Sequence, residues 1–372
     1  MNEKRYWVWL SCIPGIGARR FYKLLEFFDS PAEIFRATDA ELKHAELIIG
    51  KKNIEILRNY KSEKYLKQAD AILLNQNIRV ITLLCKEYPP LLKTIYDPPP
   101  VIYVMGQELK TNLPTIAIVG SRRSSEYGRI TARNISRTLA EAGVVIISGM
   151  ARGIDSMAHA GALDAENGYT IAVLGCGVDY IYPLENKRLY YSILERGTII
   201  SEYPPGTSPA PGNFPARNRI VSGMSHGILV VEAGIKSGAL ITVDCALEQG
   251  RDVYALPGNI NSPLSQGTNK LLKEGAKIVT SVEDIIEDLK NASLLQSQSI
   301  LPFHRPDSST QVLDLFESLV YNALEDGEKG FEDLVLLTKI EPGQLNGILT
   351  LMEIKGVIKK LPGKIFSIQW KV

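Results

Sequence analysis

The chain of 372 residues is too long for one ordinary domain, and its apolar share of 45% is enough to bury a sizeable core. Its net charge of +1 excludes a strongly basic composition, so any cationic surface must be local. The 4 cysteines lie far apart without a C-x-x-C pair, which argues against disulfides or a zinc site and favours a reducing compartment. With no signal peptide and no apolar stretch of membrane-spanning length, we expect a soluble, cytoplasmic protein without membrane insertion.

Residues 1–75 are expected to form a helical domain of the SAM-like or helix-hairpin-helix type. Apolar residues recur at helical spacing: Phe21, Leu24, Leu25 and Phe28. The segment CIPGIGARR, residues 12–20, places a Pro-Gly-x-Gly turn between two apolar helices. This turn fits a hairpin whose N–H groups face a nucleic-acid phosphate, but it fits a plain tight turn in a small bundle slightly better.

Residues 76–290 are expected to form a doubly wound, Rossmann-like parallel α/β sheet with helices on both faces. Continuous apolar runs, typical of buried parallel strands, alternate with helical stretches. The predicted strands are RVITLL (79–84), TIAIVG (115–120), VVIISG (144–149), TIAVLG (170–175), GILVVEAG (227–234) and DVYALPG (252–258). The intervening helices 125–142 and 237–249 end directly before a glycine, which is a common helix stop.

The last part of the chain is expected to hold a linker and a third domain. Residues 291–310 are polar and proline-containing, as linkers are. Residues 311–372 predict a winged helix-turn-helix. Its elements are helices at 311–325, 331–339 and 342–354 and a hairpin that turns at Pro362-Gly363. The helix that would read DNA holds a single lysine and no arginine, so we expect this domain to bind protein or only to pack.

Polar and cationic residues follow the predicted strands, where open parallel sheets bind their ligands. The turn after Gly120 lacks the dinucleotide fingerprint G-x-G-x-x-G, because the next glycine is Gly128. The cations near this edge of the sheet are Arg122, Arg152, Arg217, Arg219 and Lys236. Arginine forks bind phosphate oxygens, and a helix starting near Ser237 adds N–H donors, so we expect a site for several phosphates.

Aromatic residues near the same edge have two interpretations. Phe214, Tyr180 and Tyr182 fit base stacking, as in single-strand channels. Phe214 fits a core anchor equally well, and the two tyrosines fit a seam between helix and sheet. In the same way, Arg219 and Asp155 fit a structural ion pair.

Catalytic residues are harder to find. The sequence contains no H-E-x-x-H motif and no Walker P-loop, so ATP hydrolysis is not expected. His159 has no nucleophile beside it in the sequence, and we expect it to be structural. Glu202 and Glu232 lie near strand ends, where a carboxylate serves as acid or base or orients an arginine.

Several short motifs follow one another through the sheet domain. They are GSR (120–122), SGMARGID (148–155), GCGVDYIYP (175–183), FPARNR (214–219), EAGIKSGALIT (232–242), ALPG (255–258) and QGTNKLLKEGA (266–276). In this order they resemble the DNA-processing protein A (DprA/Smf) family, over more than half of the chain. Each motif alone is weak, but the combination is highly specific. Members of that family commonly carry an N-terminal SAM-like domain and a C-terminal winged-helix domain.

The resemblance implies a non-enzymatic protein without a cofactor that binds and protects incoming single-stranded DNA. It also implies a homodimer that loads the RecA recombinase during natural transformation, with single-strand-binding protein as a further candidate partner. The expected DNA-binding residues are Gly120, Ser121, Arg122, Arg152, Gly153, Phe214, Arg217, Asn218, Arg219, Lys236, Ser237 and Gly238. The Gly120 turn would then hold a polynucleotide phosphate. Val243 stands where the family usually has alanine, which should not disturb the phosphate turn.

Two other functions compete with this interpretation. Nucleotide phosphoribohydrolases that resemble "lysine decarboxylase" proteins share the sheet, but their P-G-G-x-G-T-x-x-E motif carries a catalytic glutamate that EAGIKSGALIT lacks. The other is an interaction scaffold that relies on the winged helix and the N-terminal hairpin. The cations retained at the strand ends argue against a scaffold.

Overall fold

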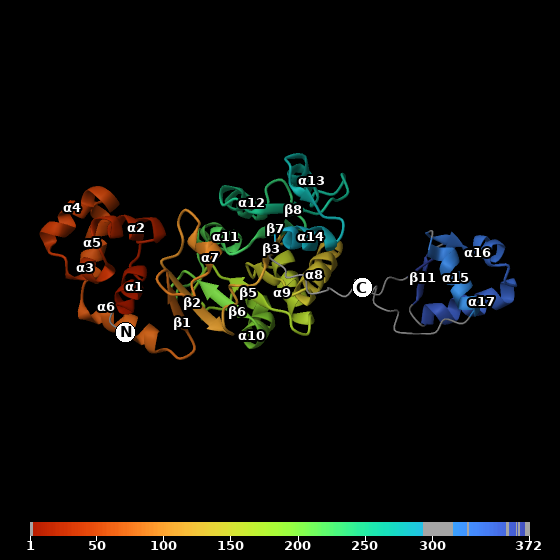
Figure 1. The fold of residues 1–372 in the computed structure, drawn as a ribbon, viewed down its shortest axis with the longest axis horizontal. Helices are drawn as coiled ribbons and strands as arrows, with labels where there is room; N and C mark the ends of the chain where they lie inside the picture. The colour runs from red at the N-terminus through yellow and green to blue at the C-terminus, as the bar shows by residue number, and fades with distance from the viewer. Residues whose placement is uncertain are drawn as a thin grey trace. The chain divides into compact units, whose positions relative to one another are not determined.

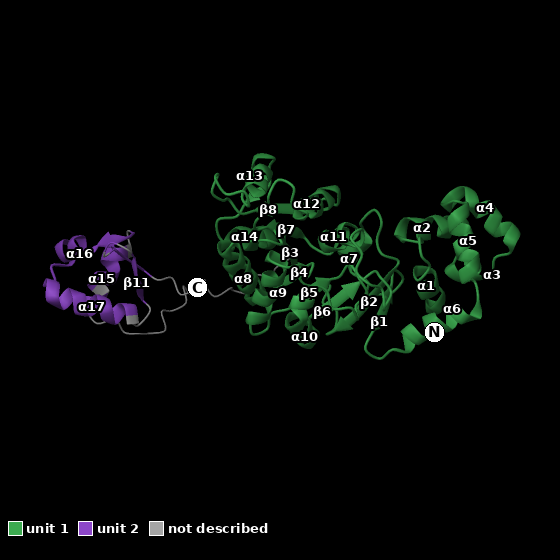
Figure 2. Cartoon of the chain, turned by 180° about the vertical axis from the view of Figure 1, so that it is seen from behind, with its two compact units in different colours: residues 1–297 green, residues 298–372 purple. Residues whose placement is uncertain are grey.

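The structure, a computed structural model, describes residues 3–292, 315–325, 327–354, 357–361, 363 and 365–368. The chain forms two compact units, residues 1–297 and 298–372 (Figure 2). The expected domain limit at residue 75 falls inside unit 1 and stays a prediction, and most of the expected linker at 291–310 lies outside the described residues. In the described part, none of the helices is long and apolar enough to cross a membrane.

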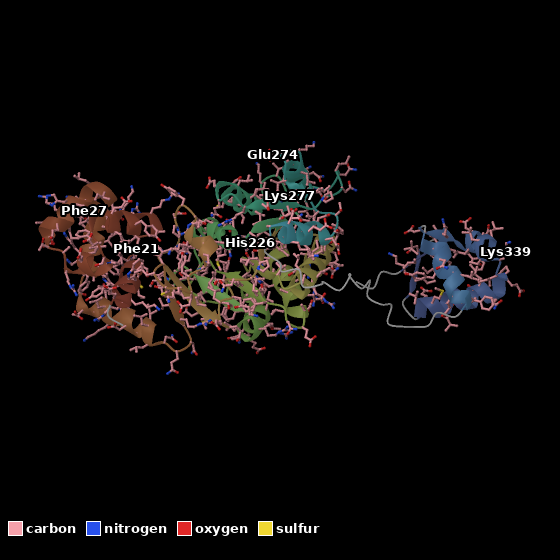
Figure 3. All side chains as sticks on the ribbon, viewed as in Figure 1. Phe21, Phe27, His226, Glu274, Lys277 and Lys339 are labelled. Carbon is pink, nitrogen blue, oxygen red and sulfur yellow. The ribbon has the colours of Figure 1, made fainter. Side chains whose placement is uncertain are left out.

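Six helices form the N-terminal part of unit 1. They are α1 (Lys4–Ser11), α2 (Ala18–Phe27), α3 (Pro31–Arg36), α4 (Asp39–Ile49), α5 (Lys51–Tyr60) and α6 (Glu63–Leu74). A capping box between Thr38 and Glu41 fixes the start of α4. Phe21 is buried among these helices (Figure 3). Their core is continuous with that of the neighbouring sheet, where Ser11 Oγ lies 2.8 Å from the Tyr103 hydroxyl.

A nine-stranded sheet occupies the centre of unit 1 (Figure 1). Its strands are β1 (Arg79–Thr82), β2 (Val101–Gly106), β3 (Thr115–Val119), β4 (Val145–Ser148), β5 (Thr170–Val173), β6 (Thr198–Ser201), β7 (Gly227–Val230), β8 (Asp252–Ala255) and β9 (Lys277–Ile278). Their order in the sheet is β1-β2-β6-β5-β4-β3-β7-β8-β9. Strands β3 to β9 form the parallel part of the sheet: each neighbouring pair of strands within this group is parallel.

The sheet is mixed, which corrects the expectation of a parallel sheet throughout. Strand β2 pairs antiparallel with both β1 and β6. The connection from β1 to β2 contains the four-residue helix α7 (Pro90–Lys93). The sequence analysis also omitted β2, β6 and β9 as strands.

Helices cover both faces of the sheet because side chains alternate along buried strands. Ile116 and Ile118 of β3 share a core with α8 and α9, whereas Ala117 and Val119 share a core with α11 and α12. The helices of this region are α8 (Glu126–Glu141), α9 (Ile154–Asp164), α10 (Lys187–Arg196), α11 (Asn213–Gly223), α12 (Ala239–Glu248), α13 (Gln266–Lys273) and α14 (Glu283–Asn291). The helices predicted at 125–142 and 237–249 are confirmed as α8 and α12.

The strand order places a topological switch point between β3 and β7. From β3 the chain proceeds outward through β4, β5 and β6, then crosses to β7 on the other side of β3 and proceeds to β8 and β9. The turns that follow β3 and β7 therefore lead away from adjacent strands toward opposite faces. Open α/β sheets bind their ligands at such a point, outside the carboxyl ends of the strands.

Unit 2 has its own small core, which includes Val320, Leu334, Leu345 and Phe366. Its elements are α15 (Leu315–Glu325), β10 (Lys329–Gly330), α16 (Phe331–Thr338), α17 (Pro342–Ile354), β11 (Ile358–Leu361) and β12 (Ile365–Ile368). The three strands form an antiparallel sheet in the order β10-β12-β11. Three helices followed by a hairpin thus occur where the sequence predicts them, although residues 311–314 and Pro362 lie outside the described residues.

Candidate nucleic-acid interface

A hollow of about 610 Å³ lies at the switch point, and we call it the switch-point groove. Its walls come from the turns after β3, β4 and β7, from α11 and from the start of α12. The predicted site residues that line it are Gly120, Ser121, Arg122, Phe214, Arg217, Asn218, Lys236, Ser237 and Gly238. Arg152, Gly153 and Arg219 were also predicted, but they do not line this groove.

The turn after β3 is held by backbone packing. A Cβ on Gly120 would lie 2.6 Å from Ile154 Cγ1 and 2.9 Å from the carbonyl oxygen of Glu232, so glycine is required for this close approach. The N–H of Ser121 donates to that same carbonyl over 2.8 Å. A ligand therefore cannot use the N–H of Ser121, which weakens the interpretation that the Gly120 turn itself holds a phosphate.

Arg122 is exposed at this turn and faces Phe214 across the groove. Its guanidinium carbon lies 5.6 Å from the centre of the Phe214 ring, within the range of a cation–π contact. No ion pair of Arg122 is found among the residues that the structure describes. A guanidinium that is exposed and free of a carboxylate can bind a phosphate without first losing another partner.

Helix α11 carries both Arg217 and Arg219, but on different faces. Phe214, Arg217 and Asn218 lie three and four positions apart, so they share the helix face that borders the groove. Arg217 is only 4% exposed, and its Nη1 donates to the carbonyl oxygen of Gly149 over 2.6 Å and also to that of Val173. Burial lowers the pKa of this guanidinium, and the nearby Asp155 carboxylate partly offsets the effect. Arg217 thus acts as a buried cation beneath the groove.

Arg219 lies on another face of α11, away from the groove. Its Nη2 is 2.6 Å from Glu202 Oε2, and its Nε is 3.4 Å from Asp97 Oδ1. The suggested ion pair between Arg219 and Asp155 is therefore wrong. Asp155 instead accepts hydrogen bonds from the N–H groups of Gly149, over 3.2 Å, and Ala151.

Arg152 projects from the turn after β4 and is exposed. Its Nη2 lies 2.5 Å from Glu185 Oε1, so this cation already has a carboxylate partner. Gly153, the next residue, has a φ of 75°, and a Cβ there would overlap the carbonyl oxygen of Ser121. Gly153 therefore allows the turns after β4 and β3 to pack together.

The turn after β7 supplies a further unpaired cation of the groove, in addition to Arg122 and Arg123 of the turn after β3. Lys236 is exposed, and none of the described carboxylates lies within ion-pair distance of it. Ser237 Oγ accepts a hydrogen bond from the N–H of Ala239 over 3.3 Å, at the start of α12. Asn218 Nδ2 donates to the carbonyl oxygen of Gly238 over 3.5 Å and so links α11 to this turn. Arg122 and Lys236 thus project from the turns after two adjacent strands.

The candidate acids, bases and nucleophiles are all engaged elsewhere. Glu232 accepts hydrogen bonds from the N–H of Ser125, over 2.9 Å, and from its hydroxyl, at the start of α8. Burial raises the pKa of Glu202, which pairs with Arg219. His159 Nδ1 lies 2.7 Å from Thr170 Oγ1, in agreement with a structural role. A G-x-S-x-G sequence at 223–227, which the sequence analysis overlooked, places Ser225 in the interior, where it donates to a backbone carbonyl.

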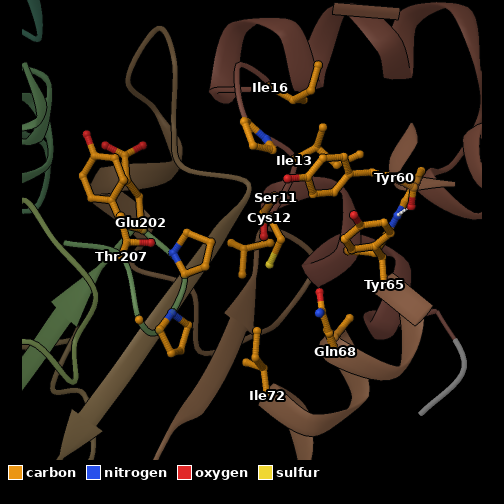
Figure 4. A pocket seen from close by; sticks show the side chains of 18 of the residues that line it. Ser11, Cys12, Ile13, Ile16, Tyr60, Tyr65, Gln68, Ile72, Glu202 and Thr207 are labelled. Atoms are coloured by element: carbon orange, nitrogen blue, oxygen red, sulfur yellow. Dashed lines mark hydrogen bonds between the residues drawn. The ribbon is translucent and has the colours of Figure 1, made fainter. Parts of the chain in front are cut away.

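A larger cleft of about 940 Å³ lies elsewhere in unit 1 (Figure 4). The α1–α2 turn, α6 and the loop 202–207 line it, with Tyr65 and Gln68 on one side and Glu202 on the other. Lys64 is the single cation among the described residues of its lining. The cleft is therefore less suited to a polyanion than the smaller switch-point groove.

Comparison with known proteins assigns the family. The family model described as DNA recombination-mediator protein A matches residues 79–290. Protein Smf of Synechocystis sp. is 34% identical, over 97% of this chain and 98% of its own length. The chain belongs to the DNA recombination-mediator protein A family. The resemblance stated from the sequence motifs is thereby confirmed.

Two solved structures of family members resemble this chain. The X-ray structure of DNA processing protein A from Streptococcus pneumoniae has a TM-score of 0.66 and 35% identity, covering 77% of this chain and 98% of that one. A structure concerned with the single-stranded DNA binding mode of DNA processing protein A from Helicobacter pylori has a TM-score of 0.52 and 31% identity. It covers 58% of this chain and 96% of its own. The α/β architecture of this family member is thus the family's architecture.

Proposed function

We propose that this family member is a recombination mediator that binds single-stranded DNA in the switch-point groove, without sequence specificity, enzymatic activity or a nucleotide cofactor. Its further partners would be a second copy of itself and the RecA recombinase, which it loads onto DNA during natural transformation. Single-strand-binding protein is an additional candidate partner. A protein with these partners would act in the cytoplasm.

One observation carries the proposal: three exposed cations without an ion pair among the described residues, Arg122, Arg123 and Lys236, converge with an aromatic ring on the groove. Arg122 and Lys236 follow adjacent parallel strands, whose axes lie about 4.8 Å apart. Phe214, at the start of α11, faces Arg122 across the groove, where a base can stack. Phosphates bound by cations and a base stacked on a ring are the two elements of binding to single strands without sequence preference.

The Helicobacter pylori protein supports the choice of ligand. Its structure concerns the binding of single-stranded DNA, and it shares 31% identity with this chain. The groove residues Arg122, Phe214 and Lys236 fall within the segment 79–290 that matches the family model. We therefore extend the ligand class of that relative to the groove of this chain.

The flanking parts would have separate roles. We assign residues 1–75 to a SAM-like helical domain, 76–290 to the DNA-binding domain, 291–310 to a linker and 311–372 to a winged-helix domain. The order helix, helix, helix and hairpin supports the last assignment. Exposed lysines of unit 2, Lys359 and Lys360, lie on the hairpin strand β11, so contact of this unit with DNA is a secondary question for the same binding assay.

A nucleotide phosphoribohydrolase is the alternative function on this sheet. Such an enzyme needs a carboxylate that reaches its substrate. Glu232 is instead engaged with Ser125 at the start of α8, and Glu202 is engaged with Arg219. Release of ribose 5-phosphate from nucleoside monophosphates, abolished by Glu232→Gln, would favour this alternative over the DNA-binding proposal.

The decisive experiment is fluorescence anisotropy with a labelled single-stranded oligonucleotide and a duplex of equal length, each at two salt concentrations. We expect the single strand to bind more tightly, with an affinity that falls steeply with salt. Binding that is absent at low salt, or equal for duplex and single strand, would contradict the proposal.

Variants locate the site within the same assay. Arg122→Ala and Lys236→Ala should each weaken binding and reduce the slope of log affinity against log salt by about 0.7, the value for one phosphate contact on a single strand. Lys93→Ala is the matched control, because Lys93 is exposed on α7, a helix whose Leu91 carbonyl accepts a hydrogen bond from Arg251 next to the amino end of β8. If both groove variants bind like the Lys93 control, the groove is not the site.

A further inference from the structure

The switch-point groove continues into two further hollows beside it. A small hollow of about 40 Å³ shares Arg122 and Phe214 with the groove. A larger hollow of about 630 Å³ shares Arg152 and Tyr182 with the small one, and we call it the tyrosine hollow. The shared lining residues place the three spaces next to one another over the carboxyl ends of β7, β3, β4 and β5, and we treat them as one path. Three strand spacings give this path a length of roughly 14 Å.

Aromatic side chains accompany this path beyond Phe214. The ring of Tyr182 lies 5.3 Å from that of Phe214, with 30° between the ring planes. Tyr182 and Tyr180 are 41% and 42% exposed, although both follow a buried strand and line the tyrosine hollow. Arg122, Phe214 and Tyr182 thus form a row of flat groups that leads out of the groove. Exposed rings in a row along a groove are the surface on which successive bases stack.

A single ion pair stands where the small hollow meets the tyrosine hollow. Arg152 and Glu185 both keep about 60% of their side-chain surface exposed, at 62% and 61%. Exposed pairs of this kind contribute little stability, so a phosphate can replace the carboxylate on Arg152 at small cost. The Glu185 carboxylate would meanwhile repel a phosphate at this position. Asp179, the other acid of the hollow, is held by the N–H of Gly206 over 2.9 Å.

We propose that the strand bound in the switch-point groove continues through the tyrosine hollow, where Tyr182 and Tyr180 stack its bases and Arg152 exchanges Glu185 for a phosphate. This inference rests on the proposed function and adds a second subsite to it. Glu185 acts there as a competing anion that weakens binding. Its removal should therefore tighten binding, which a purely structural ion pair would not do.

The first test is a length series of labelled oligothymidylates in the anisotropy assay. Wild-type affinity should rise with length beyond the few nucleotides that fill the switch-point groove. In the Tyr180→Leu variant, which keeps Tyr182 in contact with Phe214, short oligonucleotides should bind as in wild type, whereas long ones should bind roughly 5- to 100-fold more weakly, as expected for a lost stacked base. Tyr191→Leu is the control, because Tyr191 is a comparably exposed tyrosine on α10.

The second test uses the competing carboxylate. Glu185→Gln should tighten the binding of long oligonucleotides severalfold at low salt, and Arg152→Ala in the same chain should abolish that gain. Glu166→Gln makes the same charge change at an exposed position after α9 and should change nothing beyond a general charge effect. Equal effects of Glu185→Gln and Glu166→Gln would overturn the assignment of Glu185.

Failure of this inference can be separated from failure of the proposed function. If the Tyr180→Leu variant binds every length like wild type, or weakens all lengths equally, the second subsite does not exist. In that case sensitivity to Arg122→Ala still shows that the strand occupies the switch-point groove. If Arg122→Ala has no effect either, the groove itself is not the binding site.

Discussion

The guanidinium of Arg217 donates from Nη1 to the carbonyl oxygen of Gly149 over 2.6 Å, and this contact joins α11 to the turn after β4. Gly149 has no room for a side chain, because a Cβ there would overlap the same guanidinium. The N–H of Gly149 in turn donates to Asp155. Arg217 and Asp155 therefore hold the floor of the switch-point groove from below, as buried charges of opposite sign.

Arg217→Gln should destabilise the protein by about 3–5 kcal/mol, because it leaves the buried Asp155 carboxylate without its nearby cation. Urea unfolding followed by circular dichroism measures this loss. Arg122→Ala is the matched control: Arg122 is exposed, so its loss should change the unfolding free energy by no more than about 0.5 kcal/mol while still weakening DNA binding. An Arg217→Gln variant as stable as wild type would contradict the supporting role.

Arg219 should affect stability rather than DNA binding. It pairs with Glu202 and Asp97, and Asp97 also lies 3.4 Å from Arg19 of α2, so the cluster links the N-terminal helices to the sheet. Arg219→Gln should cost about 3 kcal/mol, because Glu202 is left buried without its cation. The salt dependence of DNA affinity should keep its slope, in contrast to Lys236→Ala.

A double-mutant cycle checks the origin of that cost. Adding Glu202→Gln to Arg219→Gln removes the buried carboxylate that the single variant leaves without a cation. The double variant should therefore be more stable than the sum of the two single losses predicts. Strict additivity of the two losses would show that the pair does not interact. A reduced salt slope in Arg219→Gln would restore this arginine to the DNA-contacting set.

The sequence was sufficient to locate the groove but not to assign each arginine. Continuous apolar strands and glycine helix stops gave the parallel part of the sheet, and ligand binding at strand ends gave the groove. The sequence analysis placed both Arg217 and Arg219 of FPARNR near one edge of the sheet, although this segment lies in α11. In a helix, residues two apart do not share a face, so Arg217 and Arg219 had to point in different directions.

The missed strands have a different cause. β9 is two residues long, too short to show a period or a clear apolar run. β6 has four residues, like the predicted strands β4 and β5, so its length does not explain why it was missed. β2 is longer, and its antiparallel direction appears only from its pairing with β1 and β6 in the sheet. Strand direction is a property of the connection and of pairing partners, and neither is encoded in the strand's own residues.

Gly153→Ala should both destabilise the protein and weaken DNA binding. Its φ of 75° is unfavourable for alanine, and the added Cβ would overlap the carbonyl oxygen of Ser121, displacing the turn that carries Arg122. Gly143→Ala is the matched control, since Gly143 has a φ of 83° with nothing within 4 Å of an added Cβ.

The comparison separates backbone strain from overlap. Gly143→Ala should cost only about 1–2 kcal/mol of unfolding free energy, the strain of a left-handed alanine, and should leave DNA affinity unchanged. Gly153→Ala should lower the unfolding free energy clearly more than Gly143→Ala. It should also reduce the affinity for DNA at temperatures where the variant is fully folded. Equal losses of unfolding free energy and of DNA affinity in the two variants would mean that the turn at Ser121 can move to accommodate the Cβ without changing the groove.

His159 should make the folded state less stable in acid. It is fully buried in α9, and desolvation together with the nearby positive charge of Arg217 lowers the pKa of His159 to about 3. In the unfolded chain the imidazole has its ordinary pKa of about 6.5. Between these values the unfolded state binds one proton more than the folded state, so stability rises with pH across this window and falls on acidification.

The expected contribution of His159 is a slope of about 1.4 kcal/mol per pH unit in the unfolding free energy between roughly pH 6 and 4. His159→Gln should reduce the measured slope by that amount, whatever its effect on stability at pH 7. The remaining slope includes His226, whose pKa is also lowered by burial. If His159→Gln retains the full wild-type slope, the buried imidazole takes up its proton without unfolding.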